Sequence, residues 1–321
     1  MSIKLSNTAI NLYNQCSYCW YLHYKENIRP VRTSSALVFG SALDNALNEL
    51  LKTKNLQDAQ RIFQMEWQNY HTDENITYFK SDLDEELLEY NDTIKLAQNK
   101  EWSTLYIKGM MFIEAYYKEV LPKIKKVIAV QEPITIENAE GDKITGFLDL
   151  VVEWENGKTY LMDNKSSASL YDPLSAKEGQ QLPLYHYAVK DKYKLDGIGY
   201  IVLIKKINKN KAKFCKKCGI INTSSHKKCN ETVKDEKGDS YGRCNGEFQI
   251  TINPSVDIQY VFNTVDESDE NRVLESFDNV NYAITNNFFD DKHSEIRGKY
   301  GWCPYKDYHE NSIDFIKKEY K

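Results

Sequence analysis

The sequence predicts an α/β or α+β protein in which helices cover a mixed central sheet. Two observations lead to this prediction. Helix-forming residues with few Gly or Pro dominate the chain as far as Pro122, and from residue 127 the period changes to that of short strands separated by turns. A helical segment and a further apolar run, residues 199–204, come later. Helices, an antiparallel meander, a helix and more strand are the order expected for such a sheet.

The first half of the chain is expected to be helical. A helix over residues 6–26 has Ser6 as its N-cap. A second helix is expected to start near Ser34 or Ser35, because apolar residues or Gly recur every three or four positions at Leu37, Gly40, Leu43, Leu47 and Leu50. Residues 55–120 are helical in composition, and the acidic stretch Asp82–Asp92 is interpreted as a solvated face.

The second half is expected to be mainly strand, with turns at Glu140-Gly141 and Asn156-Gly157. The strands predicted before the next helix are residues 127–130, 134–136, 144–152 and 159–162. A helix from about residue 180 to 193 and the buried strand 199–204 follow. The last predicted elements are a strand, 248–252, and a long helix, 255–287.

Composition narrows the class of protein. The chain has 321 residues, 41% of them hydrophobic and 28% charged, which suits one large globular domain or two ordinary ones. No apolar run approaches 18 residues and no signal peptide is recognisable, so a soluble, cytoplasmic protein with no membrane contact is expected. The net charge of −5 means that any nucleic-acid contact must be a local basic patch. Four of the seven cysteines fall within 30 residues, which favours a metal site over disulfides.

Two carboxylates and a lysine stand at the ends of two short strands joined by a tight turn. Gly146-Phe-Leu-Asp149-Leu is followed, fourteen residues after its aspartate, by Asp163-Asn-Lys165. Side chains alternate along a strand, so Asp163 and Lys165 share one face and Asn164 points to the other. A two-residue turn would place Asp149 opposite Asn164, whereas a three-residue loop with a left-handed glycine places it opposite Asp163. We therefore predict an odd-length loop, or a bulge with the same effect.

This group suits phosphodiester chemistry. Asp149 and Asp163 offer hard oxygen ligands for Mg²⁺ or Mn²⁺, which would acidify water and neutralise phosphate charge. Lys165 would orient or deprotonate the water, since a lysine beside a cation has a depressed pKa, or stabilise the transition state. The alternative is an exposed Asp–Lys pair at a strand end.

These motifs, taken in order, resemble the PD-(D/E)XK nuclease superfamily, and most closely its RecB-like branch, which includes CRISPR adaptation nucleases and many phage exonucleases. The segments that carry the resemblance are Tyr13-Asn-Gln-Cys16, Gly40-Ser-Ala-Leu-Asp44, Gly146-Phe-Leu-Asp149, Leu161-Met-Asp163-Asn-Lys165, Gly179-Gln-Gln181-Leu-Pro-Leu-Tyr185 and Trp302-Cys303-Pro-Tyr. The resemblance spans nearly the whole chain except residues 205–247. It implies a restriction-endonuclease-like core, metal ligation by Asp149 and Asp163, and a catalytic Lys165.

Gln181 and Tyr185 match the Q-x-x-x-Y pair of this branch. Because they are four residues apart, they share one helix face, from which amide and phenol can reach a DNA phosphate or the active site. The alternative is the polar face of an ordinary helix. Pro183 fits only if this helix starts near residue 180.

The chain departs from the branch in its metal ligands. Asp44 replaces the usual histidine, and as a carboxylate it is kept as a third Mg²⁺ or Mn²⁺ ligand, the alternative being a surface acid. Glu132, on a preceding strand, is either near the metals or a solvated acid.

The iron–sulfur cluster of the branch is not expected here. Cys16 and Cys303 remain, but Lys306 and His309 stand where further cysteines would be required. Cys16, Cys19, Cys303 and His309 either form an unusual site or, as we favour, include buried thiols that pack the termini together.

Residues 205–247 form an expected zinc-ribbon-like insertion into a nuclease domain made of residues 1–204 and 248–321, whose helical part ends near 122. Cys215-Lys-Lys-Cys218 is a good zinc knuckle, and Cys229 and Cys244 complete the set, with His226 as the alternative to one cysteine. The insertion also carries seven lysines proposed to contact nucleic acid, with a solubilising run as the alternative: Lys205, Lys206, Lys209, Lys211, Lys213, Lys216 and Lys217.

The sequence thus predicts a Mg²⁺- or Mn²⁺-dependent deoxyribonuclease with structural zinc. An exonuclease acting on single strands or DNA ends in recombination, replication or repair is expected. Proteins of those processes are its expected partners, and a bacterial cytoplasm or a phage origin fits. The alternatives are a non-catalytic DNA-binding accessory protein on a decayed nuclease fold, or an RNA nuclease.

Overall fold

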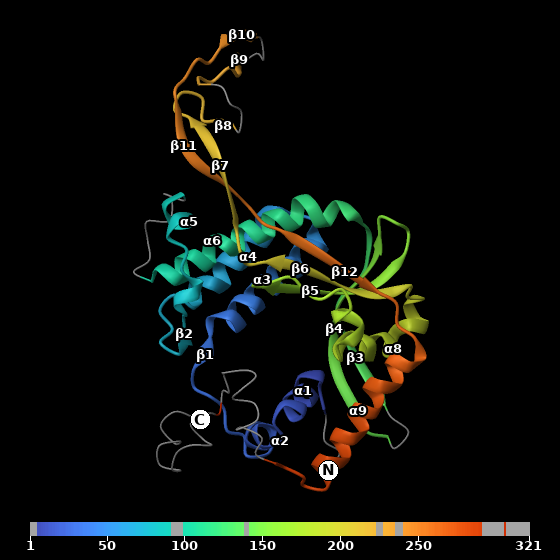
Figure 1. The fold of residues 1–321 in the computed structure, drawn as a ribbon. Coiled ribbons are helices and arrows are strands. Elements are labelled where there is room, and N and C mark those ends of the chain that lie inside the picture. Colours follow the sequence, from blue (N-terminus) through green and yellow to red (C-terminus); the bar gives the residue numbers. More distant parts are fainter. Residues whose placement is uncertain are drawn as a thin grey trace.

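A five-stranded mixed sheet forms the centre of the computed structural model, which describes residues 5–90, 99–137, 141–222, 227–234, 240–290 and 305. The strand order is β12-β6-β5-β4-β3 (Figure 1). The bounds are β3 Ile124–Glu137, β4 Lys143–Trp154, β5 Thr159–Ser167, β6 Gly197–Ile204 and β12 Ile258–Asn263. Strands β3, β4 and β5 form an antiparallel meander, β6 runs parallel to β5, and β12 runs antiparallel to β6. The predicted mixed sheet is confirmed.

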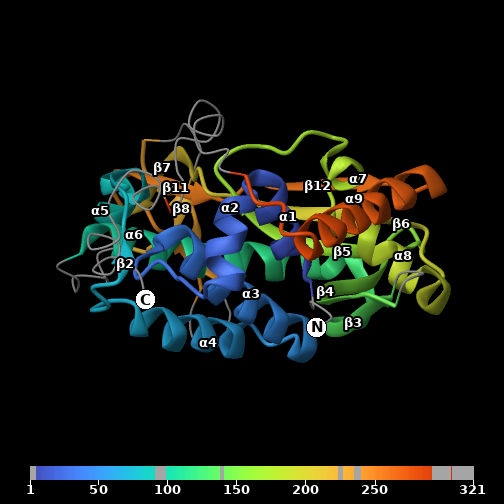
Figure 2. The same cartoon turned by 90° about the horizontal axis from the view of Figure 1, so that it is seen from below.

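Helices cover both faces of this sheet (Figures 1 and 2). One apolar core lies between the sheet and α3 (Ser35–Thr53), α4 (Leu56–Asn69) and α6 (Lys100–Ala115). A second core packs the opposite face against α1 (Asn7–Gln15), α8 (Gln181–Tyr193) and α9 (Glu267–Thr285). All eight residues of β6 are buried, as expected for a strand covered on both sides.

The N-terminal segment is helical but broken. Ser6 caps α1, as predicted, by accepting a hydrogen bond from the Ala9 N–H at 3.2 Å. The single helix predicted over residues 6–26 is wrong, because Cys16 has extended backbone (φ −158°). Its sulfur accepts from the Cys19 N–H at 3.4 Å and so starts the short helix α2 (Ser17–Trp20), which continues as a π-helical turn to Lys25.

The helix predicted over residues 255–287 begins too early. Its first residues form strand β12, which is rich in β-branched and aromatic side chains. Helix α9 starts only after Asp266, whose carboxylate accepts from the Asp269 N–H while the Asp269 carboxylate accepts from the Asp266 N–H. This reciprocal cap sets the boundary that composition alone did not reveal.

The helical block before the sheet follows the prediction with one correction. It contains α5 (Glu85–Tyr90) as well as α4 and α6, and a 3₁₀ turn at Leu121–Lys123 ends it. The start of the acidic stretch is not a solvated face. Asp82 accepts hydrogen bonds from the Ser35 hydroxyl at 2.7 Å and the Phe79 N–H at 2.9 Å, and Asp84 caps α5. Asp92 lies outside the described residues.

The segment between β6 and β12 projects from the body in Figure 1, and its residues 208–255 are called the arm below. Strands β7 (Asn208–Cys215), β8 (Ile221–Asn222) and β11 (Phe248–Ser255) form a three-stranded sheet, and β9 (Thr232–Lys234) pairs with β10 (Ser240–Arg243) at the far end. The strand predicted at residues 248–252 exists, but it belongs to the arm rather than to the central sheet.

Three minor features complete the fold. Strand β1 (Thr33–Ser34) pairs with β2 (Ile76–Thr77), and helix α7 (Ser175–Glu178) precedes α8. The strands predicted at 127–130 and 134–136 are one continuous strand, β3. Within the part of the chain that the structure describes, every helix is too short or too polar to cross a membrane.

Candidate active site and metal centres

Trp154 and Lys158 close the turn between β4 and β5, so that three residues, Glu155–Gly157, lie between them. The Trp154 N–H donates to the Lys158 carbonyl at 2.9 Å across its base, and Gly157 has a left-handed φ of 80°. A residue with a side chain is disfavoured in that conformation, so glycine suits the turn. The predicted odd-length loop is confirmed.

This loop sets the register of the acidic residues. Extending the ladder of β4 and β5 by one pair beyond its last bonded residues brings Asp149 opposite Asp163. Lys165 lies two residues further on β5 and pairs with Asp163 through its ammonium group. Asn164 accepts a hydrogen bond from the Tyr116 hydroxyl at 3.1 Å, on the α6 side of the sheet, as alternation requires.

A cavity of about 490 Å³ opens beside these residues. Helix α3 supplies Asp44 to its wall, β4 supplies Asp149, and the start of α8 supplies Gln181. The polar and charged residues that line the cavity are Ser41, Asp44, Asn164, Ser166, Gln181, Asp149, Asp163 and Lys165. The structure therefore brings together all three predicted metal-binding acids and the predicted catalytic lysine.

Charge in the cavity is unbalanced, because three carboxylates face one ammonium group. Burial, reinforced by Asp163, raises the pKa of Asp149 to about 9, and burial also raises the pKa of Asp44. Burial alone would lower the pKa of Lys165, but the charges of Asp163 and Asp149 outweigh it and raise that pKa above its usual range. Carboxylates gathered in this way repel one another, so the site favours a bound cation. Oxygen donors of this kind are those that Mg²⁺ and Mn²⁺ prefer.

Two amide side chains that were not predicted also belong to the site. The Asn48 amide, one turn after Asp44 on α3, donates to Asp44 Oδ2 at 2.9 Å. The Gln131 amide on β3 donates to Asp44 Oδ2 at 3.2 Å and to Asp149 Oδ1 at 3.3 Å. The spacing of four residues to Asp44 could have indicated Asn48. Gln131 carries no such signal, because its position depends on the bend of β3.

Gln181 and Tyr185 share α8 as predicted, but they contact different parts of the site. Gln181 is the first residue of α8 and lines the cavity. Because the helix begins there, Pro183 lies in the first turn, where a proline is tolerated. Tyr185 is buried and packs against Gly146, where an added Cβ would lie 2.6 Å from its hydroxyl oxygen. Burial, followed by the charges of Asp149 and Asp163, raises the pKa of Tyr185 to about 12.

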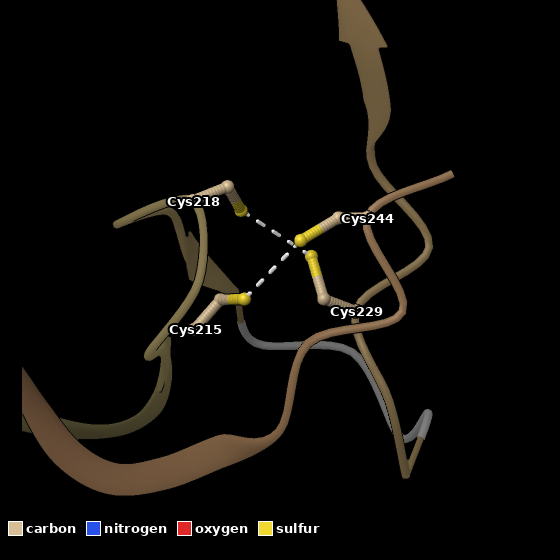
Figure 3. A group of neighbouring side chains, drawn as sticks. All are labelled: Cys215, Cys218, Cys229 and Cys244. Carbon is tan, nitrogen blue, oxygen red and sulfur yellow. Dashed lines mark hydrogen bonds between the residues drawn. The ribbon is translucent and has the colours of Figure 1, made fainter. Parts of the chain in front are cut away.

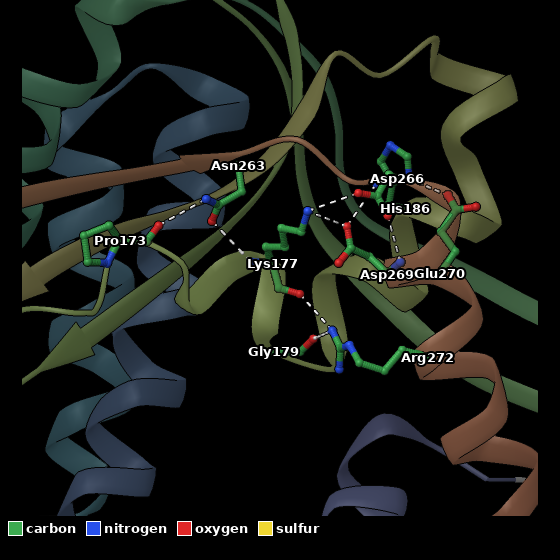
Figure 4. Close-up of polar contacts among 9 residues, drawn as sticks. All are labelled: Pro173, Lys177, Gly179, His186, Asn263, Asp266, Asp269, Glu270 and Arg272. Carbon is green, nitrogen blue, oxygen red and sulfur yellow. Dashed lines mark hydrogen bonds and ion pairs between the residues drawn. The ribbon is translucent and has the colours of Figure 1, made fainter.

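Helix α9 fastens the segment that leads from β5 to α8 (Figure 4). The Arg272 guanidinium donates to the carbonyls of Lys177 at 2.8 Å and Gly179 at 3.2 Å. The Lys177 ammonium pairs with Asp266 at 3.2 Å and Asp269 at 3.0 Å, at the N-terminus of α9. These contacts fix the end of α7, and with it the point where α8 begins.

A second contact between α8 and α9 is buried. Glu270 bonds to the His186 ring at 2.8 Å and pairs with the Lys190 ammonium at 2.5 Å. His186 and Lys190 are one turn apart, so they lie on the same face of α8. Both contact Glu270, and these contacts hold α8 against α9. The position of Gln181 and Tyr185 thus depends on polar contacts as well as on apolar packing.

Glu132 lies apart from the acidic cluster. It pairs with Lys192 and accepts a hydrogen bond from Tyr193, both on α8. These partners lower its pKa, with Lys192 contributing most. Its possible place near the metals is therefore wrong, and it is an ion-paired acid near the surface.

The N-terminal cysteines pack in a small apolar cluster. Cys16 and Cys19 are buried there with Leu22 and Tyr305. This arrangement agrees with buried thiols near the junction of the two ends of the chain. Cys303, Lys306 and His309 lie outside the described residues.

The four cysteines of the arm form one cluster (Figure 3). Their sulfur atoms all lie within 4.8 Å of one another, and those of Cys215 and Cys244, and of Cys218 and Cys229, are 3.6 Å apart. A tetrahedral zinc ion with Zn–S bonds of about 2.3 Å requires sulfur separations of about 3.8 Å. The cluster fits one such ion. His226 lies outside the described residues.

The backbone around this cluster is shaped for it. The Gly219 N–H donates to the Cys215 carbonyl at 2.9 Å and Gly219 has φ 76°, which closes the knuckle. A Cβ on Gly246 would lie 2.6 Å from the Cys215 sulfur, so only glycine fits there. Burial alone would raise the pKa of Cys215, but the N–H groups of Cys218 and Lys217 lower it to about 6. The thiolate is the form that binds metals.

The seven predicted nucleic-acid-binding lysines do not share one environment. Lys205 lies over the Phe39 ring, 5.5 Å from its centroid, and Lys209 pairs with Asp84 at 2.6 Å and Glu86 at 3.1 Å. Both therefore contribute to the junction of arm and body. Lys213 lies near the Phe248 ring, and the exposed members are Lys206, Lys211, Lys216 and Lys217.

Comparison with known proteins agrees with this geometry. Residues 4–308 match the PD-(D/E)XK nuclease superfamily, which is nearly the whole chain. No curated protein matches the chain significantly. Nucleases of this superfamily depend on divalent metals, as the acidic cavity between α3, β4 and β5 would require. A match of this extent, over a mixed sheet that carries the acids and the lysine on adjacent strands, shows that the chain belongs to the PD-(D/E)XK nuclease superfamily.

Proposed function

We propose that this chain is a deoxyribonuclease of the RecB-like branch, an exonuclease that degrades single-stranded DNA or DNA ends in recombination, replication or repair. One observation carries the proposal: Asp44, Asp149, Asp163 and Lys165 converge on a single cavity. These residues come from α3, β4 and β5, so their meeting depends on the whole fold. A non-catalytic descendant would have no reason to retain three acids around a lysine at such electrostatic cost.

Asp44, Asp149 and Asp163 would hold Mg²⁺ or Mn²⁺. Their buried carboxylates are hard donors, and the replacement of histidine by Asp44 suits an oxygen-preferring ion. When bound, the divalent ion supplies Lewis acidity toward the scissile phosphodiester and toward water.

The remaining side chains would position the substrate. Lys165, paired with Asp163, would orient the attacking water or stabilise charge on the phosphate. Gln181 is placed at the cavity wall to donate its amide N–H to a phosphate oxygen. Tyr185, one turn further along α8, would fix the position of β4 near Asp149 or donate its hydroxyl to the DNA backbone.

We further propose that residues 205–247, which include most of the arm, are a zinc-binding insertion that contacts DNA. The described residues within these limits contain eleven Lys or Arg and two Glu, in a chain whose net charge is −5. Exposed lysines of this kind contact phosphates with little regard to sequence. Lys206, Lys211, Lys213, Lys216 and Lys217 are the members we assign to DNA, because Lys205 and Lys209 have partners in the body.

Digestion of end-labelled single- and double-stranded DNA with added Mn²⁺ tests the proposal. We expect wild-type protein to shorten the substrate from an end, and Asp163→Ala and Lys165→Ala to abolish cleavage while both variants unfold cooperatively. Glu132→Gln serves as the matched control, because that acid is engaged with α8 and should leave the rate unchanged. Cleavage retained in both active-site variants would contradict the assignment. Cutting of circular single strands would establish an endonuclease, and preference for an RNA competitor would change the substrate.

A further inference from the structure

Gln131 has a left-handed backbone conformation, which is uncommon for a residue other than glycine. It lies inside β3 with φ 51°, in the left-handed region, although Val130 pairs with Leu150 and Glu132 pairs with Leu148 on either side. A non-glycine residue in this region costs about 1–2 kcal/mol. Such strain persists only where the surrounding structure imposes it, and it is often found at functional sites.

The side chain of Gln131 contacts two residues of the acidic site at once. Its Nε2 atom donates to Asp44 Oδ2 at 3.2 Å and to Asp149 Oδ1 at 3.3 Å. An amide nitrogen has two N–H groups, so each carboxylate can receive its own. The bridge joins α3 to β4, whose nearest ends, Thr53 and Lys143, are ninety positions apart in the sequence.

A neutral amide suits the position between Asp44 and Asp149. A lysine or arginine between the two acids would compete with a cation through its charge, and a glutamate would add to the repulsion. A neutral donor does neither, and it orients the carboxylates before a cation arrives. Outer hydrogen-bond partners of this kind commonly change metal affinity by about 10–100-fold.

We propose that Gln131 is a positioning residue that orients Asp44 and Asp149, both of which line the cavity, toward one shared divalent cation. This inference rests on the proposed function of the cavity. It assigns Gln131 no contact with DNA, so it predicts an effect on metal binding that exceeds the effect on turnover.

Mn²⁺ binding by isothermal titration calorimetry of the full chain tests the inference. Gln131→Met keeps the length of the side chain but removes the donors, and Gln131→Gly also removes the backbone strain. Both should weaken Mn²⁺ binding about 10–100-fold, while kcat at saturating Mn²⁺ falls less than the apparent metal affinity. Glu132→Gln, the next residue along β3, should bind Mn²⁺ as the wild type does. Thermal unfolding of each variant shows whether the fold is intact.

Asp149→Ala, titrated in parallel, separates this inference from the proposed function. Loss of Mn²⁺ binding in Asp149→Ala with wild-type binding in Gln131→Met would overturn the inference and leave the function standing. Wild-type binding in Gln131→Gly alone would also overturn it, because the amide would then be dispensable. A wild-type protein that binds no Mn²⁺ would overturn both.

Discussion

Gly146→Ala should disturb the active site by forcing a shift of Tyr185 or of β4. A Cβ at this position would lie 2.6 Å from the Tyr185 hydroxyl oxygen, 3.1 Å from Cζ and 3.3 Å from Cε1. Carbon atoms in contact normally lie about 3.5–4.0 Å apart, so the ring or the strand must shift. Tyr185 is 6% exposed and belongs to a helix fastened by α9, which leaves little room for that shift. Overpacking of this kind costs about 1–3 kcal/mol, and the loss of glycine flexibility in the unfolded chain returns about 0.4–1 kcal/mol.

A double-mutant cycle with Tyr185→Phe isolates the contact. That substitution removes the nearest atom, so the remaining approach of 3.1 Å needs only a small adjustment. We expect Gly146→Ala to lower the free energy of unfolding by about 1–2 kcal/mol, and the double variant to recover about 1 kcal/mol relative to the sum of the single effects. Urea unfolding followed by tryptophan fluorescence measures both quantities. Effects that add within about 0.5 kcal/mol would refute the reasoning, because the ring would then be free to move.

Three further predictions concern other parts of the molecule. Chelation of zinc should expose residues 208–255 to limited proteolysis while the body stays resistant, because the cysteine cluster is the arm's main buried centre. Asn55→Ala should lower the free energy of unfolding by about 1 kcal/mol in urea titrations, since its side chain caps α4, whereas Asn55→Gly should cost only a few tenths. Joint replacement of Lys216 and Lys217 by Ala should reduce the salt dependence of DNA binding, log K against log salt, by about two, whereas Lys209→Ala should leave that slope unchanged.

The sequence was most informative where the geometry follows from the number of residues between two positions. The count of residues between Asp149 and Asp163 indicated that an odd-length loop or a bulge is needed to bring the two acids opposite each other, and the structure has a three-residue loop with a left-handed Gly157. Spacing four residues apart likewise placed Gln181 and Tyr185 on one helix. Such relations are local, so no knowledge of distant contacts is required.

Other features depend on contacts between distant segments. Gln131 reaches the acids only because β3 adopts a left-handed residue, and nothing in its neighbours encodes that bend. Lys209 looked like part of a basic run, but the fold supplies Asp84 beside it. Strand β12 lies within a segment predicted to be helical because its six residues directly precede a strongly helical segment. Its β-branched and aromatic side chains and the cap at Asp266 mark the change.

The arm leaves and re-enters the body through neighbouring strands. Leu203, near the end of β6, pairs with Ile258 at the start of β12, so the two attachment points are one strand spacing apart, about 4.8 Å. A tight hairpin could close the same gap. The nuclease body is therefore compatible with loss, exchange or lengthening of this module during evolution, since none of these changes would require its strands to be re-paired.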